Sequence, residues 1–312
     1  SFLEANDENC SEEYLVNFFK TKYSTLKDAE IDAIVKGTLE KLKIPNEDLL
    51  NEYIYRYFFD VFCGQIKKIS EGRKKSKVTI TFKEGHNKIS FYANYCKTVQ
   101  EVAIAHPAYY IDNPFVLDKL NEDRFYFMQG NNLNGNVVSV ILNSEEEQSD
   151  DKMTNLFDSV SNKRKLDCVR AVLKKAYPGE TILKNGSYYY HEGNADFDFR
   201  NISTGLKAFA LIERLLESGK LKQKDVLILD EPEIHLHPEW QLIYAETIVA
   251  LQKEFDLTVL VTTHSPYFLE AIEVYTKRYN LKEKTNYYLA TNEDESCFME
   301  NVPADVQPNA KT

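Results

Sequence analysis

The sequence lacks the features of a membrane protein or of a disulfide-bonded secreted protein. No apolar run approaches the roughly 20 residues that a membrane-spanning helix needs, and no signal peptide is visible. The five cysteines stand singly, without a C-x-x-C pair, which argues against a disulfide framework and against a cysteine zinc site. These absences predict a soluble, cytoplasmic protein with reduced thiols.

Internal repeats, heptad arrays and low-complexity linkers are absent as well, so no long coiled coil is expected. The 312 residues, of which 43% are hydrophobic, are enough to bury a large core in one big domain or in two. The net charge of −11 argues against nucleic-acid binding through the whole surface. Basic stretches at 67–77 and 163–175 could contact DNA or RNA phosphates locally, or could simply be solvated.

A phosphate-binding P-loop, G-x-x-x-x-G-K-[ST], does not occur in the sequence. The nearest spacing begins at Gly130, but Asn136 and Val137 stand where the lysine and the serine or threonine should be. The asparagines of this stretch are typical of a surface turn. We therefore do not predict a phosphate site there.

The segment "VLILDEPEIHLHPEW" places two adjacent carboxylates at the end of a short apolar run. Residues 226–229 are apolar without alternation, which predicts a strand buried on both faces of a parallel sheet. Asp230 and Glu231 follow at its carboxyl end, where open α/β sheets bind their ligands. A strand end that merely exits to solvent is the alternative, and the neighbouring segments decide between the two.

Those neighbours predict a second strand beside the first. Pro238 opens a stretch with helical spacing of apolar residues, and residues 259–262 form another apolar strand that leads to His264. Ser265 and the proline after it can cap and begin the next helix. Because short strand-helix-strand connections make parallel neighbours, the two acids and His264 should lie along one edge of one sheet.

A third candidate segment lies upstream, at "DFRNISTGLKAFALIERLLESGK". Ser203, Thr204 and Gly205 precede an amphipathic run, so they should form a small turn at a helix N-terminus. Unpaired N–H groups and the helix dipole attract an anion such as phosphate to that position. A plain helix cap is the alternative that the segment alone leaves open.

In this order, the three segments resemble ABC-type ATPases of the SMC-like branch. "ISTGLK" is similar to their signature motif, "VLILDEPEIHLHP" to their Walker B strand with its catalytic glutamate, and "VLVTTHSPYFLEA" to their switch-histidine loop. The sequences of these segments are most similar to those of the AAA-type ATP-binding proteins grouped with the OLD family and with the PtuA-like ATPases of bacterial anti-phage systems. The resemblance covers about residues 180 to 290.

The resemblance implies roles for the residues at the strand ends. Asp230 would hold Mg²⁺, through water, because this ion keeps several waters and takes only one or two carboxylates. Glu231 would act as general base for the attacking water, and His264 would contact the γ-phosphate of ATP.

The resemblance also implies that the active site is shared between two protomers. Ser203, Gly205 and Lys207 would bind the γ-phosphate of an ATP molecule held by a second copy of the chain. ATP would then join two protomers, as a homodimer or a higher even oligomer, and hydrolysis would release them. His235 and His237 would lie in a loop facing that dimer interface; a zinc site is the alternative, for which partners at suitable spacing are not found.

The missing P-loop has two explanations. "SFLEA" at the start of the sequence resembles the beginning of the helix that follows the P-loop in this family, which implies that the first strand and the loop lie outside the sequence. The alternative is a degenerate ATPase that has lost the loop. Intact Asp230, Glu231 and His264 favour the first explanation, because an inactive site would not require these residues.

The expected architecture is an α/β protein with a P-loop NTPase, ABC-ATPase-like lobe. Residues 1–176 should form a lobe of helices and antiparallel strands, and residues 177–312 the parallel-sheet lobe with the three motifs. Hairpins are predicted at 77–95, where apolar and polar residues alternate, and at 181–193, with a turn at Asn185-Gly186. A strand followed by a short helix is predicted at 108–120.

The expected function is an ATP-hydrolysing dimeric switch in bacterial anti-phage defence that controls a separate effector, a nuclease or toxin in another chain. The residues after 290 carry no acidic constellation of a Toprim nuclease, so the chain itself is not expected to cut nucleic acid. Two alternatives stay open: an SMC-like DNA-repair ATPase, which would show DNA-stimulated turnover, and a nucleotide-sensing scaffold with little hydrolysis.

Overall fold

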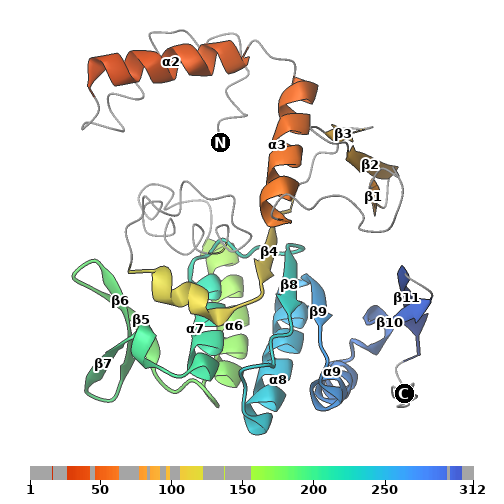
Figure 1. Cartoon of the computed structure of the whole chain (residues 1–312). Helices are drawn as coiled ribbons and strands as arrows, with labels where there is room; N and C mark the ends of the chain where they lie inside the picture. The colour runs from red at the N-terminus through yellow and green to blue at the C-terminus, as the bar shows by residue number, and fades with distance from the viewer. Residues whose placement is uncertain are drawn as a thin grey trace. The chain divides into compact units, whose positions relative to one another are not determined.

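The computed structural model describes most of the chain, in two compact units, Ser1–Ala103 and Ile104–Thr312 (Figure 1). The described residues are 27–42, 46–62, 77–82, 85–91, 96–98, 106–121, 156–293 and 296–303, with Val16 and Val137. The sequence predicted a boundary near residue 176, whereas the division observed falls between Ala103 and Ile104.

The described residues of the first unit include the helices α2 and α3 and a small antiparallel sheet. The elements are α2 (Asp28–Leu42), α3 (Asn46–Val61), β1 (Lys77–Phe82), β2 (Gly85–Phe91) and β3 (Cys96–Thr98). Strand β2 pairs antiparallel with both β1 and β3, which confirms the predicted hairpin. Cys96 is buried among side chains of α3, and its thiol donates a hydrogen bond of 2.9 Å to the carbonyl of Asn51. The segment "SFLEA", which resembles the beginning of the helix that follows the P-loop, lies outside the described residues.

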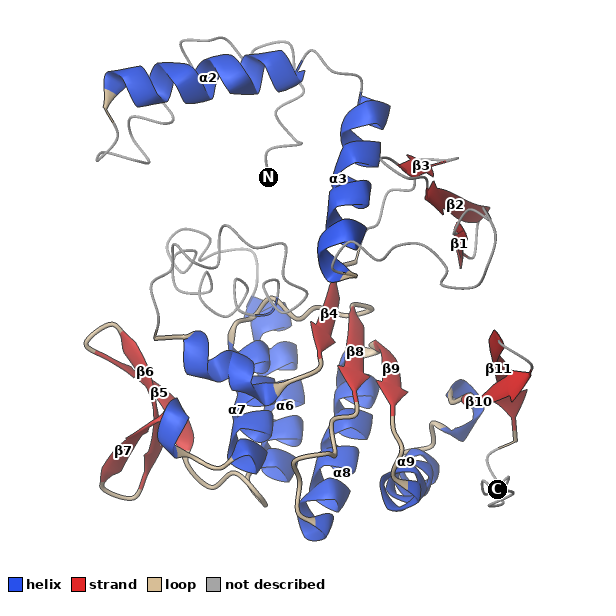
Figure 2. Ribbon diagram, in the orientation of Figure 1, coloured by secondary structure: helices blue, strands red, loops and turns tan. Residues whose placement is uncertain are grey.

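The second unit is built on a three-stranded parallel sheet. Its strands are β4 (Ala108–Ile111), β8 (Val226–Asp230) and β9 (Thr258–Thr262), in the order β4-β8-β9. All three arrowheads point the same way in Figure 2, and both pairings are parallel. The carboxyl ends of three segments that are distant in the sequence therefore meet at one edge.

The described part of the second unit also contains helices and two antiparallel sheets. The helices are η1 (Pro114–Lys119), α6 (Leu156–Leu173), η2 (Phe199–Asn201), α7 (Thr204–Glu217), α8 (Pro238–Phe255), α9 (Pro266–Arg278) and η3 (Lys282–Lys284). The remaining strands are β5 (Glu180–Lys184), β6 (Ser187–Glu192), β7 (Ala195–Asp198), β10 (Tyr287–Glu293) and β11 (Ser296–Val302). The turn between β5 and β6 has positive φ at Asn185 and Gly186, as the predicted hairpin requires. In the described residues no helix is long and apolar enough to cross a membrane.

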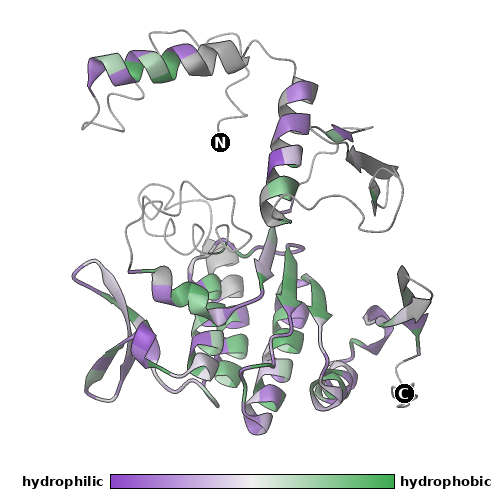
Figure 3. Ribbon diagram, in the orientation of Figure 1, coloured by the Kyte–Doolittle hydropathy of each residue, from purple (hydrophilic) through white to green (hydrophobic). Residues whose placement is uncertain are grey.

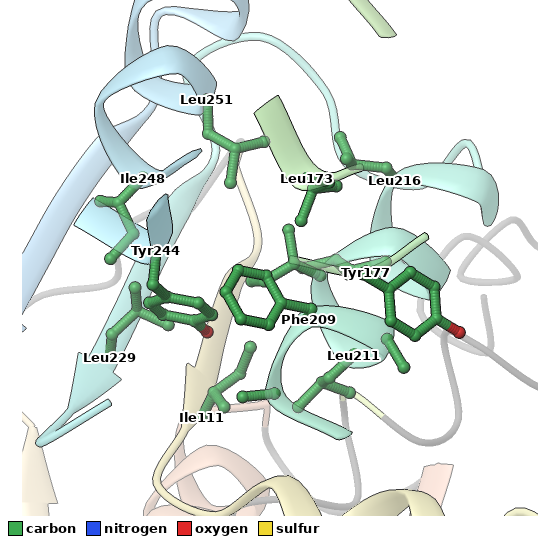
Figure 4. Close-up of a cluster of buried hydrophobic side chains, with 14 of the residues drawn as sticks. Ile111, Leu173, Tyr177, Phe209, Leu211, Leu216, Leu229, Tyr244, Ile248 and Leu251 are labelled. Carbon is green, nitrogen blue, oxygen red and sulfur yellow. The ribbon is translucent and has the colours of Figure 1, made fainter. Parts of the chain in front are cut away.

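The core of the second unit lies between the sheet and helices α6, α7 and α8. Phe209 of α7 packs edge-on against Tyr244 of α8, with ring centroids 5.2 Å apart. Figure 4 shows these two rings beside Leu229 of β8 and Leu173 of α6, all of them buried. The Walker B-like strand and the signature-like helix are therefore fixed by the same apolar cluster.

The predicted burial of the sheet on both faces is wrong for one face within the described residues. Leu227 and Leu229 of β8 are fully buried, whereas Val226 and Ile228, which point to the opposite face, are only half-buried. On β9, Leu260 is 53% exposed. Figure 3 shows the hydrophobic character of both strands. The apolar run has no alternation, so its pattern could not reveal that helices α7 and α8 pack against one face only.

A buried carboxylate of α7 makes the stability of the second unit dependent on pH. Glu213 accepts hydrogen bonds from Lys174 at 3.2 Å and from the backbone N–H of Thr181 at 3.2 Å. Burial raises the pKa of Glu213, the charge of Glu217 adds to this effect, and Lys174 opposes it. Above about pH 4.5, the folded state therefore binds more protons than the unfolded state. The free energy of unfolding should fall as the pH rises from that value through the raised pKa of Glu213.

We expect Glu213→Gln to weaken this pH dependence of the free energy of unfolding. Urea unfolding of the variant and the parent, measured at half-unit steps from about pH 4.5 to 8, should give a shallower pH dependence for the variant, because glutamine cannot titrate. Glu239→Gln, at an exposed position of α8, is the matched control. Identical slopes for Glu213→Gln and the parent would contradict the prediction.

Candidate functional site

Asp230 is held by both neighbouring strands at the carboxyl edge of the parallel sheet. It is the last residue of β8 and lies opposite Thr262, the last residue of β9. The hydroxyl of Tyr110 on β4 donates to Oδ2 of Asp230 at 2.9 Å, and the Thr262 hydroxyl donates to Oδ1. Two donors from two strands fix the position of the carboxylate.

The next residue, Glu231, meets His264 across the same edge. Nε2 of His264 lies 2.9 Å from Oε1 of Glu231, and the two side chains are 89% and 32% exposed. Glu231 has φ +46°, a left-handed conformation that costs energy for a residue with a Cβ. Its amide is held in place by the carbonyl and hydroxyl of Thr262, at 3.1 and 3.0 Å. The structure thus brings the predicted base and the predicted switch histidine into direct contact.

The turn between Glu231 and α8 presents two histidines. The ring of His235 lies edge-on to Phe115 of η1, with centroids 5.8 Å apart, and His237 is the residue before α8. Both side chains are exposed. Across the part of the chain that the structure describes, no group of three or more His, Cys, Asp or Glu side chains is placed to hold a metal ion.

The donor set at the strand ends suits Mg²⁺. This ion keeps several waters and binds through one or two carboxylates, so it does not need a cluster of three protein ligands. Asp230, which is anchored and half-buried, supplies one such carboxylate, and Glu231 lies next to it in the chain. Thus Asp230 fits a water-mediated magnesium ligand.

The signature-like segment forms a capped helix N-terminus, as predicted. Ser203 precedes α7, and its hydroxyl accepts a hydrogen bond of 3.3 Å from the backbone N–H of Leu206. Just upstream, Asp198 forms a two-bond pair with Arg200, with both distances 2.9 Å. Hydrogen bonds from Arg200 hold the pKa of Asp198 below its usual range, so this carboxylate is anionic at neutral pH. This pair stabilises the turn before the helix, while Ser203 itself is exposed.

Gly205 is required by the packing of α7 against α8. An added Cβ would lie 2.8 Å from two carbons of the Trp240 ring and 3.5 Å from the carbonyl oxygen of His235. The ring of Trp240 in turn packs edge-on against Phe209, so it has little room to move. Gly205 therefore joins the start of the signature-like helix to the start of the helix that follows the Walker B-like strand.

We expect Gly205→Ala to destabilise the protein by about 1 to 3 kcal/mol, because the added methyl group overlaps the indole ring. Urea unfolding would measure the change in unfolding free energy. Adding Trp240→Leu to Gly205→Ala should recover part of the loss, since the smaller side chain leaves space for the methyl group. A Gly205→Ala protein as stable as the parent would show that the ring moves freely.

Lys207 is placed differently from what a phosphate ligand would need. It is 3% exposed, and its Nζ lies 2.6 Å from Oδ1 of Asp118 in η1 and 4.8 Å from the centroid of the Phe115 ring. The ammonium group thus ties the first turn of α7 to η1. Within the described residues, no hydrogen bond or ion pair joins Ser203, Gly205 or Lys207 to the strand-end residues.

Part of the basic stretch at 163–175 is used inside the fold. Lys174 pairs with Glu213, Lys175 lies 2.6 Å from a carboxylate oxygen of the buried Glu246, and Arg170 pairs with Glu217. These side chains hold α6 against α7 and α8. Lys163 and Arg164, at the start of the same stretch, are exposed.

Several site residues were not predicted from the sequence. Tyr110 carries no motif, and only the pairing of β4 with β8 shows that its hydroxyl reaches Asp230. Thr262 and Thr263 belong to the segment "TTHS", so their proximity to His264 was visible, but their hydrogen-bond partners were not. Glu233 is buried, and its position close to Glu231 was likewise visible in the segment "DEPE", but its contacts were not.

Comparison with known proteins identifies the family of this fold and site. Residues 36–270 match the family described as "AAA domain, putative AbiEii toxin, Type IV TA system". Two solved structures are similar. One, described as structural biochemistry of ATP-driven dimerization and DNA-stimulated activation of SMC ATPases, is 16% identical over 45% of this chain and 87% of its own, with a TM-score of 0.33. The other, an SMC head domain from Thermotoga maritima, is 13% identical over 73% of each chain, with a TM-score of 0.33.

The family match spans well over half of the chain, and the chain has the expected α/β parallel-sheet architecture. The protein therefore belongs to this AAA-domain family of P-loop NTPases.

Proposed function

We propose that this chain binds and hydrolyses ATP, dimerises around the nucleotide and acts as a switch that controls a separate effector. The observation that carries the proposal is the 2.9 Å contact between Glu231 and His264, beside the anchored Asp230, at the carboxyl edge of a parallel sheet. A base next to a polar partner at this edge is the arrangement that water activation near a bound phosphate needs. The family description names a putative toxin of a type IV toxin–antitoxin system, which supports a role in a system of more than one component. In the proposal the effector is another chain, as in anti-phage defence.

The strand-end residues have distinct roles in this proposal. Asp230 would hold Mg²⁺, and Tyr110 and Thr262 keep its carboxylate in place. Bound Mg²⁺ supplies neutralisation of phosphate charge. Glu231 takes the proton of the attacking water, while His264 orients the Glu231 carboxylate and contacts the γ-phosphate.

The signature-like turn is proposed to act on the nucleotide of a second protomer. Ser203 is exposed at the N-terminus of a helix of 14 residues, where the dipole and the free N–H groups favour an anion. Gly205, which is buried against Trp240, contributes by letting the turn pack closely on α8 and not by a direct contact with phosphate. Lys207, which is buried against Asp118, contributes by anchoring the turn to η1 rather than by a direct contact with phosphate.

The test is ATP turnover and oligomeric state of the full-length protein. We expect steady-state phosphate release in the presence of Mg²⁺, and a shift from monomer to dimer by light scattering when ATP is added. A protein that neither binds ATP nor changes its mass would contradict the proposal, and the contact between Glu231 and His264 would need another explanation.

A DNA-repair ATPase is the second candidate. It is favoured by the exposed Lys163 and Arg164 of α6, which could meet nucleic-acid phosphates. This candidate predicts that double-stranded DNA stimulates ATP turnover and that Lys163→Glu with Arg164→Glu removes the stimulation. Turnover that is indifferent to DNA would leave the effector switch as the better account.

A further inference from the structure

The loops after β8 and β9, which carry the proposed catalytic pair, are joined by a closed ring of hydrogen bonds. The Thr263 hydroxyl donates to Oε1 of Glu233, and the backbone N–H of Ser265 donates to Thr263 Oγ1 at 3.0 Å. The Ser265 hydroxyl donates to Oε1 of Gln241 at 3.4 Å. Nε2 of Gln241 closes the ring by donating to the Glu233 carbonyl at 3.5 Å. In the sequence, His264 lies between two members of this ring, Thr263 and Ser265.

Glu233 is an unusual residue for the turn that it occupies. It is 4% exposed, and its Oε2 is buried without a hydrogen-bond partner in the described part of the chain. Burying a carboxylate whose oxygen lacks a partner costs free energy, which a glutamate on a short turn could avoid by pointing to solvent. The inward orientation is the one that lets Glu233 accept the hydrogen bond from Thr263.

The same turn is also stiff along its backbone. The N–H of Ile234 donates to the Glu231 carbonyl at 3.2 Å, and the N–H of Leu236 donates to the Glu233 carbonyl at 2.9 Å. Gln241 of α8 adds a third hydrogen bond, from Nε2 to the Leu236 carbonyl at 3.2 Å. A displacement of Glu233 is therefore transmitted to Glu231, two residues earlier.

The exposure of His264 shows why such a ring matters. Its side chain is 89% exposed, so packing contributes little to its position, and its location depends on the backbone of the residues on either side. Those residues, Thr263 and Ser265, are the two members of the ring on the β9 side. A small displacement of a catalytic group can reduce turnover by roughly a hundredfold.

We propose that Glu233 is a positioning residue: through Thr263 it locks the loop that carries His264 to the turn that follows Glu231, and so keeps the two reacting side chains in contact. The proposal rests on the proposed ATPase function. Neither Glu233 nor Thr263 touches the reacting atoms, and both act through the Glu231–His264 pair.

The first test is the kinetics of Thr263→Val in the full-length protein. Valine keeps the shape of threonine but has no hydroxyl, so kcat for ATP should fall roughly ten- to a hundredfold while KM for ATP stays within about twofold. Thr263→Ser should restore kcat because it retains the hydroxyl. Thr247→Val is the matched control: Thr247 is buried in α8, and its hydroxyl donates to the Ile243 carbonyl at 2.8 Å, within the helix. Its kcat should equal that of the parent.

The second test needs no ATP. Hydrogen exchange of the nucleotide-free protein should become faster in both segments, 232–237 and 263–266, in Thr263→Val and in Thr263→Ala, because the ring joins them. Thr247→Val should leave both segments unchanged. This measurement also shows whether Thr263→Val is folded, since exchange elsewhere, for example in α8, should match the parent.

The outcomes separate the two proposals. A parent protein without ATP turnover would overturn the proposed function and the positioning role with it. A parent that hydrolyses ATP, with unchanged kcat in Thr263→Val, would overturn the positioning role alone. Faster exchange confined to 263–266 would also overturn it, because the two loops would then not be coupled.

Discussion

Glu231→Gln will lower ATP turnover by about 10²- to 10⁴-fold and leave an ATP-bound dimer that persists. Glutamine has the size of glutamate, and its carbonyl oxygen can still accept a hydrogen bond from His264, so the contact of 2.9 Å can be kept. The amide cannot take a proton from water, so the loss falls on the chemical step rather than on binding. Steady-state phosphate release and light scattering in the presence of ATP measure the two effects.

The control for this variant is a substitution of the same kind away from the site. Glu283→Gln, in the exposed η3, should hydrolyse ATP at the rate of the parent. Normal turnover in Glu231→Gln would remove Glu231 from the mechanism. A parent that binds ATP and dimerises without turnover would instead support the nucleotide-sensing scaffold.

The local structure of the site follows from short-range signals in the sequence. Ser265 accepts a hydrogen bond from the N–H of Phe268 at 3.2 Å and caps α9, and the proline after it begins the helix. Ser203 caps α7 in the same way. Apolar runs of four or five residues between such caps predict strands of the observed length, since the cap and the run together leave the backbone few alternatives.

The contacts that fix the site depend on long-range pairing, which no local pattern encodes. Tyr110 and Asp230 are 120 residues apart in the sequence, and they meet because β4 pairs in register with β8. Lys207 occurs where the resemblance implies a phosphate ligand, yet the position of η1 supplies Asp118 as its partner. The buried or exposed state of Leu260 likewise depends on which elements cover the sheet. A residue type at the right spacing therefore predicts a candidate, whereas its partner has to be observed.

The separation of the two halves of the site sets up the most discriminating prediction. Ser203 and Gly205 lie at the start of α7, while Glu231 and His264 lie at the ends of β8 and β9, and no described hydrogen bond or ion pair joins the two groups. A site that is complete only in a dimer has this property, because each half then serves a different nucleotide.

Ser203→Arg will abolish both ATP turnover and ATP-dependent dimerisation. The position is exposed, so the arginine can be accommodated in the monomer at the cost of the helix cap, about 1 kcal/mol, and its bulk then fills the space proposed for the partner's phosphate. Ser203→Ala loses the same cap, so equal unfolding midpoints for the two variants in urea would show that the arginine acts through the interface and not through stability. Dimerisation of Ser203→Arg with ATP would contradict the composite site.

Mixing the two inactive variants then tests whether the two halves of one active site come from different chains. In a dimer of one Ser203→Arg chain and one Glu231→Gln chain, the intact Glu231 of the first and the intact Ser203 of the second meet at one of the two sites, while the other site carries both defects. An equal mixture should therefore regain turnover that neither variant shows alone, because each mixed dimer has one working site. If both halves of the site belonged to the same chain, every chain in the mixture would carry a defect, and no turnover would return.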